Sequence, residues 1–176
     1  GVAIYRLRAG EALYSAVDIA SISDPVSCER VGRQRASVAE SAGGDSVLTV
    51  FMEVDLDKPY FQSACGPHCF YTPRTDGLST LGNWWDIASG GLGTGEEKEA
   101  LKAWVGKYLD LTTYEISCPA LRDASLAPEG KTGVIVSTLL DYDLAKRIQN
   151  AGWYDEFKAH CIEKITAVLN STLLPG

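Results

Sequence analysis

The segment 65–69, with the sequence Cys-Gly-Pro-His-Cys, holds side chains that zinc commonly uses as ligands. Its two cysteines are separated by three residues, whereas thioredoxin-like redox sites have two. A tetrahedral zinc site also needs a fourth ligand, and no motif spacing supports the side chains that remain: Cys28, Cys118, His160 and Cys161. We therefore predict a turn without a metal, and metal binding stays as a weaker alternative.

A glycine-rich stretch at residues 89–95 could expose backbone amides to a pyrophosphate, as in dinucleotide-binding folds. The fingerprint Gly-x-Gly-x-x-Gly fails here, because Glu96 stands at its third glycine position when the count begins at Gly91. The following turn is acidic and would repel phosphate. We predict a loop, followed by a helix that Thr94 caps with Glu97 in a capping box.

No arrangement typical of a nucleophilic enzyme is present. The chain has no Gly-x-Ser-x-Gly elbow, and its two histidines leave few candidates for a general base. Asp141 and Asp143 form a carboxylate pair, but Asp141 is explained as the cap of a helix. The residues themselves therefore predict no catalytic group.

Composition excludes several classes of protein. The 176 residues are 45% hydrophobic and 22% charged, and no apolar run approaches the roughly 20 residues that span a bilayer. The formal net charge of -7 argues against nucleic acid as a partner, because phosphate binding depends on basic residues. Five widely spaced cysteines and the lack of a secretory signal pattern favour a cytoplasmic setting.

Periodicity predicts the elements that must position these side chains. Alternating or apolar runs predict strands at 47–54, 69–72, 113–118 and 134–140. Apolar residues at helical spacing, with capping signals, predict helices at 26–39, at 95–109, after Asp141 and from Trp153 to Leu169. Both faces of 47–54 are largely apolar, so we expect this strand inside a covered sheet.

The order of these elements lacks a regular βαβ rhythm and predicts an α+β fold with a mixed, largely antiparallel sheet packed by helices. We expect residues 1–44 to form a variable, mainly helical lead-in and residues 45–176 to form the α+β domain. The chain begins without methionine and stops just after a helix, so we expect it to be a section of a longer protein.

Residues 122–131, with the sequence Arg-Asp-Ala-Ser-Leu-Ala-Pro-Glu-Gly-Lys, resemble a segment of the phytoene dehydrogenase-like flavoproteins of the amine-oxidase superfamily, which include carotenoid isomerases. In that family the segment reads Asp-Pro-Ser-Leu-Ala-Pro-x-Gly and precedes a strand; Ala124 replaces its first proline. The stretches 47–55, 69–73 and 150–157 are similar to neighbouring parts of the family.

The resemblance implies an internal part of the substrate-binding domain of an FAD-dependent oxidoreductase. The two glycine-rich segments that hold the flavin in the family are missing, so we expect FAD in the parent protein, bound by another domain of the same polypeptide, and none on this chain. The implied substrate is a lipophilic small molecule, a polyene or isoprenoid. The resemblance leaves open whether the parent protein is membrane-peripheral. Loss of covering domains could make the chain self-associate.

We expect this chain to form part of the substrate cavity, with one face of its sheet packed on helices and the other lining the pocket. The residues that we select as pocket-lining are Tyr114, Ile116 and Cys118, with Phe51 and Tyr71 behind them; each is equally compatible with a core position. Arg122 and Asp123 are candidates for a domain or flavin interface, or for fixing the long turn. The resemblance assigns no catalytic residue to this chain. The alternative function is a self-contained lipid- or protein-binding module without redox activity.

Overall fold

The computed structural model describes residues 16–40, 45–88, 92 and 95–175. The chain divides into two units, Gly1–Gly43 and Gly44–Gly176, and each is described by itself. In the first unit, a 3-10 turn (Ile19–Ser21) precedes α2 (Pro25–Glu40), which begins at the predicted Asp24-Pro25 signal. Asp24 Oδ2 accepts a hydrogen bond of 2.8 Å from the Ser27 amide, and α2 has no buried residue.

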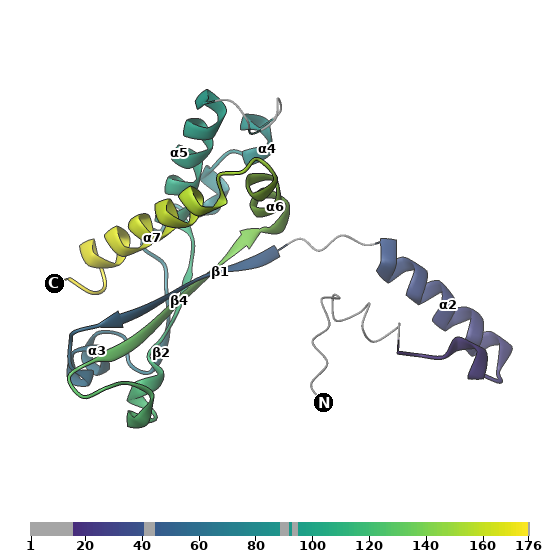
Figure 1. Ribbon diagram of the computed structural model, residues 1–176, viewed down its shortest axis with the longest axis horizontal. Helices are drawn as coiled ribbons and strands as arrows, with labels where there is room; N and C mark the ends of the chain where they lie inside the picture. The colour runs from purple at the N-terminus through teal and green to yellow at the C-terminus, as the bar shows by residue number, and fades with distance from the viewer. Residues whose placement is uncertain (1–15, 41–44, 89–91, 93–94, 176) are drawn as a thin grey trace. The chain divides into compact units, whose positions relative to one another are not determined.

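The second unit is built on a four-stranded antiparallel sheet in the order β1-β4-β3-β2 (Figure 1). Its strands are β1 (Asp45–Val54), β2 (His68–Tyr71), β3 (Tyr114–Ser117) and β4 (Thr132–Asp141). The ten residues of β1 pair with the ten of β4, so that Val50 lies opposite Val136, which in turn lies opposite Ile116. The four predicted strands are confirmed, and the fold is α+β.

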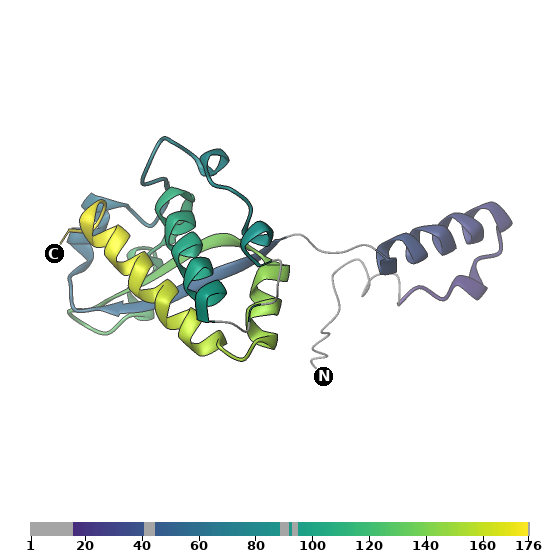
Figure 2. The same cartoon turned by 90° about the horizontal axis from the view of Figure 1, so that it is seen from above.

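Helices cover one face of this sheet (Figure 2). The two long ones, α5 (Gly95–Leu111) and α7 (Tyr154–Ser171), pack against each other, and α6 (Tyr142–Asn150) packs against α7 and β4. Shorter elements complete the unit: α3 (Lys58–Ala64), α4 (Trp84–Ile87) and the 3-10 turns Leu78–Thr80, Pro119–Leu121 and Ala124–Leu126. The predicted helices are confirmed, although Thr94 lies outside the described residues.

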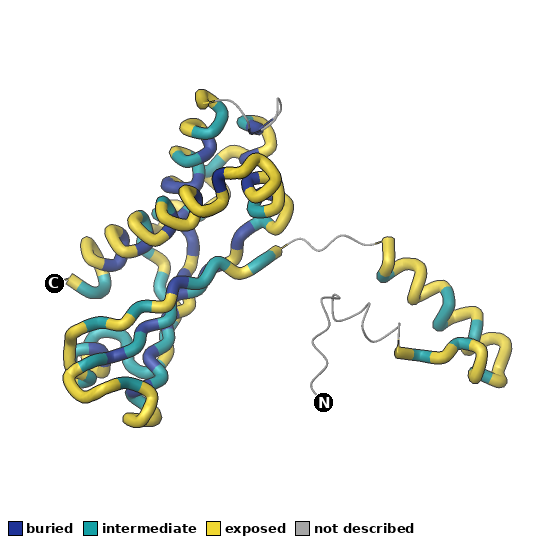
Figure 3. The backbone as a smooth tube through the Cα atoms, viewed as in Figure 1, coloured by how far each residue is buried: buried dark blue, intermediate teal, exposed yellow. Residues whose placement is uncertain are grey.

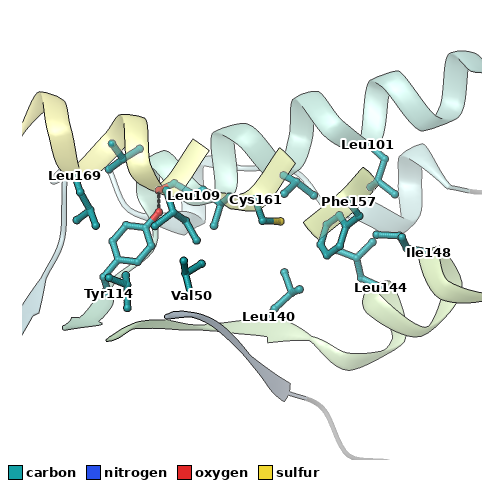
Figure 4. Packing of buried hydrophobic residues seen from close by; sticks show 14 of the residues in the cluster. Val50, Leu101, Leu109, Tyr114, Leu140, Leu144, Ile148, Phe157, Cys161 and Leu169 are labelled. Carbon is teal, nitrogen blue, oxygen red and sulfur yellow. Dashed lines mark hydrogen bonds between the residues drawn. The ribbon is translucent and has the colours of Figure 1, made fainter. Parts of the chain in front are cut away.

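The core lies between the sheet and these helices. Phe157 of α7 is 1% exposed and lies among residues of α5 and α6, while Val50, Tyr114 and Leu140 point toward the helices from the strands (Figure 4). Polar groups on this side are satisfied: the Tyr114 hydroxyl donates to the Leu109 carbonyl, and the Thr112 and Thr138 hydroxyls lie 2.7 Å apart. The helices are thus fixed to the sheet by apolar contacts and by buried hydrogen bonds.

The ends of α6 follow the sequence signals. Asp141 caps the helix, because its Oδ1 accepts a hydrogen bond of 3.0 Å from the Leu144 amide. Gly152 has a φ of +83° just after the helix, a conformation that favours glycine. These two positions place α6 across the end of β4 and turn the chain into α7.

The position of β1 corrects one prediction. It is an edge strand that pairs only with β4, and just one of its faces is covered by the helices, so the expectation of a strand inside a covered sheet is wrong. Exposed residues alternate with less exposed ones along it (Figure 3). Apolar character on both faces was compatible with either arrangement, because periodicity does not say how many layers cover a strand.

No helix among the described residues combines the length and the apolar character that crossing a membrane requires.

Replacement of Phe157 tests the central role of the helix layer. We expect Phe157→Ala to lower the free energy of unfolding by about 3–5 kcal/mol, because it removes a fully buried ring and leaves a cavity. Urea unfolding followed by circular dichroism measures this loss. Ile162→Ala is the matched control on the same helix, since Ile162 is 49% exposed, and it should cost less than about 1 kcal/mol. Equal losses for the two variants would contradict the assigned core.

Candidate functional site

We call the face of the sheet opposite the helices the open face and define it by ten side chains; Asp45, Glu53 and Asp141, at the strand ends, lie on the same side by register. They follow from the strand register, because side chains alternate along a strand and directly paired residues share a face. The set consists of Val47, Thr49 and Phe51 from β1, His68 and Phe70 from β2, Glu115 and Ser117 from β3, and Ile135, Ser137 and Leu139 from β4.

Large apolar side chains are exposed on the open face. The exposed fractions are 75% for Phe51, 70% for Phe70, 63% for Val47 and 55% for Leu139. Val47 pairs with Leu139 across β1 and β4, and Phe51 pairs with Ile135 four residues further along β1. These two pairs form an apolar strip along the two longest strands, which the polar pair Thr49 and Ser137 interrupts between them. Exposed apolar surface of this kind is typical of a binding surface.

The polar side chains of the open face largely bond to one another. His68 Nε2 lies 2.9 Å from Glu115 Oε1, and Thr49 Oγ1 lies 3.0 Å from Ser137 Oγ. The Phe70 ring stands edge-on to the His68 ring, with centroids 5.3 Å apart. Because these polar groups already have partners, an apolar ligand could cover them at a smaller desolvation cost than unpaired groups would impose.

The open face contains a shallow hollow of about 330 Å³. Its lining combines the apolar residues Val47, Phe70 and Leu139 with polar residues that include Glu115 and Ser137. A second apolar hollow, between β1, α3 and α7, has only about 140 Å³. Small-molecule sites usually measure roughly 300–1,000 Å³, so of these two apolar hollows only the one on the open face reaches that range.

The five residues selected from the sequence as pocket-lining do not lie together. Tyr114, Ile116 and Cys118 are fully buried in the core under the helices, and Tyr71 packs against that core from the same side. Phe51 alone lies on the open face. The alternation within residues 113–118 is confirmed, and the structure places its apolar set in the core, the other position considered for these residues. A role of the five residues in a substrate pocket stays a prediction, since alternation alone does not say which face the helices cover.

The pair His68 and Glu115 was not among the residues selected from the sequence. Alternation does place Glu115 on the face opposite Tyr114 and Ile116, which was a usable signal. Its partner could not be found, because the two residues are 47 positions apart in the sequence and meet only through the β2–β3 register. On the open face the pair lies next to the exposed Phe70 ring.

Arg122 and Asp123 lie in the connection between β3 and β4. Asp123 Oδ1 accepts hydrogen bonds from the Ser125 amide, at 3.0 Å, and from the Ser125 hydroxyl, at 2.7 Å, and these bonds lower the pKa of its carboxyl group. The Arg122 amide donates to the Pro119 carbonyl at 2.9 Å. These contacts fix the turn, which was one of the two roles considered for this pair; a role at an interface stays a prediction.

The Cys-x3-Cys segment places its possible ligands on different sides of the sheet. His68 and Cys69 are neighbours in β2, so the imidazole lies on the open face and the thiol on the helix-covered face. Across the described residues, no group of three or more His, Cys, Asp or Glu side chains is placed to hold a metal ion.

The described residues do not fit the pyrophosphate of a flavin. Such a group binds at a helix N-terminus that is free of negative charge. The helices of eight residues or more that the structure describes all begin at carboxylates: Asp24 before α2, Glu96 and Glu97 in α5, Asp141 and Asp143 at α6, and Asp155 and Glu156 in α7. We therefore derive no step through FAD from this chain.

Comparisons with known proteins give no significant match: none with a protein-family model, none with a curated protein and none with a solved structure.

Replacements on the two faces of the sheet should have opposite consequences. We expect Ile116→Ser to lower the free energy of unfolding by at least about 3 kcal/mol, because it buries a hydroxyl in the core, whereas Phe70→Ser should change it by about 0.5 kcal/mol. Urea unfolding measures both. Phe70→Ser should also weaken binding of the dye ANS to the native protein, which Ile162→Ser on the outer side of α7 should not do. A large loss of stability in Phe70→Ser would show that the open face is covered.

Proposed function

We propose that this chain forms the substrate-binding layer of an FAD-dependent oxidoreductase resembling the phytoene dehydrogenases, and that its open face is one wall of the cavity for a lipophilic polyene or isoprenoid substrate. The observation that carries the proposal is the open face itself, an antiparallel sheet with an apolar strip on the side that the helices leave uncovered. The resemblance of residues 122–131 supplies the class of enzyme.

The open face has the physical properties that such a wall needs. Val47 and Leu139 offer apolar contact at one point along β1 and β4, and Phe51 offers it at a second point, while a polyene is long and apolar. The other side of the sheet packs against the helices in the hydrophobic core, so binding would not require the wall to order itself. This chain would bind and orient the substrate and exclude water from it.

The flavin in this proposal is held by residues of the same polypeptide outside this chain. FAD would supply the hydride chemistry of the parent enzyme. The residues of this chain would contribute position and apolar surroundings, and no catalytic residue is assigned to it.

A second candidate function is a self-contained module that binds a lipid or a partner protein. The observation in its favour is that residues 45–175 hold a continuous hydrophobic core between the sheet and the helices, so the unit does not depend on another domain for its own packing. The open face would be the binding surface in this case also.

Binding of a fluorescent polyene to the purified chain tests the role of the open face. We expect all-trans-retinol to quench tryptophan fluorescence at micromolar concentration, and the double variant Phe51→Ser, Phe70→Ser to weaken the affinity by about tenfold or more, because two apolar contacts are lost. Ile162→Ser, an equally polar change on the outer side of α7, should leave the affinity unchanged. Equal affinity of the double variant and the original chain would refute a polyene site on this face.

The reading frame around residues 1–176 separates the two functions. A Gly-x-Gly-x-x-Gly strand-turn-helix encoded before residue 1, together with flavin absorbance of the complete purified protein, would support the oxidoreductase. A start codon directly before residue 1 and a stop codon directly after residue 176 would support the module instead, and flavin absorbance of these 176 residues alone would contradict the assignment of FAD to another domain.

A further inference from the structure

Three of the five cysteines converge under the edge of the sheet, away from the open face. Cys65 follows the last turn of α3, Cys69 lies in β2 and Cys118 follows β3. The Cys65 and Cys118 sulfur atoms are 3.9 Å apart, which is contact distance for two thiols, and all five cysteines are free. The convergence joins residues that are 53 positions apart in the sequence.

The backbone around Gly66 explains the convergence. Gly66 has a φ of +66°, in the left-handed region that favours glycine, and its amide donates to the Phe61 carbonyl at 2.9 Å. This turn ends α3 and leads the chain into Pro67, whose carbonyl accepts a hydrogen bond of 3.1 Å from the Cys118 amide. Cys65 is thereby brought back beside Cys118.

We propose that Cys65 and Cys118 form a reversible disulfide bond when the protein meets a small-molecule disulfide such as glutathione disulfide, and that this bond joins the end of α3 to the end of β3. A disulfide requires about 2.05 Å between the sulfur atoms. The gap is closed by rotation of the Cys65 side chain, which is half-buried and lies in a short surface connection, toward the fully buried Cys118.

The reaction is a two-electron exchange. The Cys65 thiolate attacks a sulfur atom of glutathione disulfide, which forms a mixed disulfide and releases one glutathione thiolate. The Cys118 sulfur then attacks the Cys65 sulfur of the mixed disulfide, loses its proton to solvent and releases the second glutathione. Two protein thiols are oxidised to one disulfide, and glutathione disulfide is reduced to two glutathione molecules.

The surroundings of the thiols affect the rate of this exchange. Burial, together with the neighbouring Cys118 thiol, raises the pKa of Cys65 to about 12, so the reactive thiolate is scarce at neutral pH and the first step is slow. The second step joins two sulfur atoms that are already in contact, so the protein disulfide is favoured over a lasting mixed disulfide. The experiment therefore measures the equilibrium rather than the rate.

The test equilibrates the reduced chain in glutathione buffers with an increasing share of glutathione disulfide. Free thiols are then alkylated in denaturant and counted by intact mass, and peptide mapping identifies the bonded pair. We expect the alkylated count to fall from five to three, the mapped bond to join Cys65 to Cys118, and the melting temperature to rise by about 5 °C. A reducing dithiol should reverse each change.

Variants separate this pair from its neighbours. Cys65→Ser should keep all remaining thiols free, and it is the main variant because Cys65 is only half-buried; Cys118→Ala should do the same but replaces a core residue. Cys69→Ala is the matched control and should still form the bond. Five free thiols at the most oxidising ratio, a bond between Cys65 and Cys69, or glutathione adducts without an internal bond would each overturn the proposal.

Discussion

The packing of α5 and α7 on a single face of the sheet is the contact on which the rest of the structure depends. Side chains of a strand alternate between two faces, so each of the four strands presents one set of residues to the helices and one set away from them. The helix side buries Tyr114, Ile116 and Phe157 and binds the sheet into one unit. The opposite side is left as the open face by the same arrangement.

The open face links the fold to the proposed function. Its polar groups are paired with one another, as His68 is with Glu115, and its exposed surface is dominated by apolar side chains such as Phe51 and Phe70. An apolar ligand, or a partner with an apolar surface, would be stabilised there by the hydrophobic effect. Both proposed functions, the oxidoreductase and the binding module, use this surface. They differ in whether the complete polypeptide also contains a flavin-binding domain.

Much of the local structure could be predicted from the residues. Alternation located the strands, apolar spacing located the helices, and Asp24, Asp141 and Gly152 marked helix ends that the structure confirms. The candidate site could be predicted only in part. Apolar character on both sides of residues 47–54 predicted one face for the helices and one for a pocket. Tyr114, Ile116 and Cys118, which were selected for the pocket, lie on the face that the helices cover.

The sequence by itself determined which segments are strands or helices and which residues share a face, because both follow from local periods of two and of about 3.6 residues. The tertiary structure decided the strand order, the face that the helices cover, the pairing of His68 with Glu115 and the contact of Cys65 with Cys118. Each of these joins residues far apart in the chain. Their geometry follows from register and from the packing of whole elements, which local periodicity does not encode.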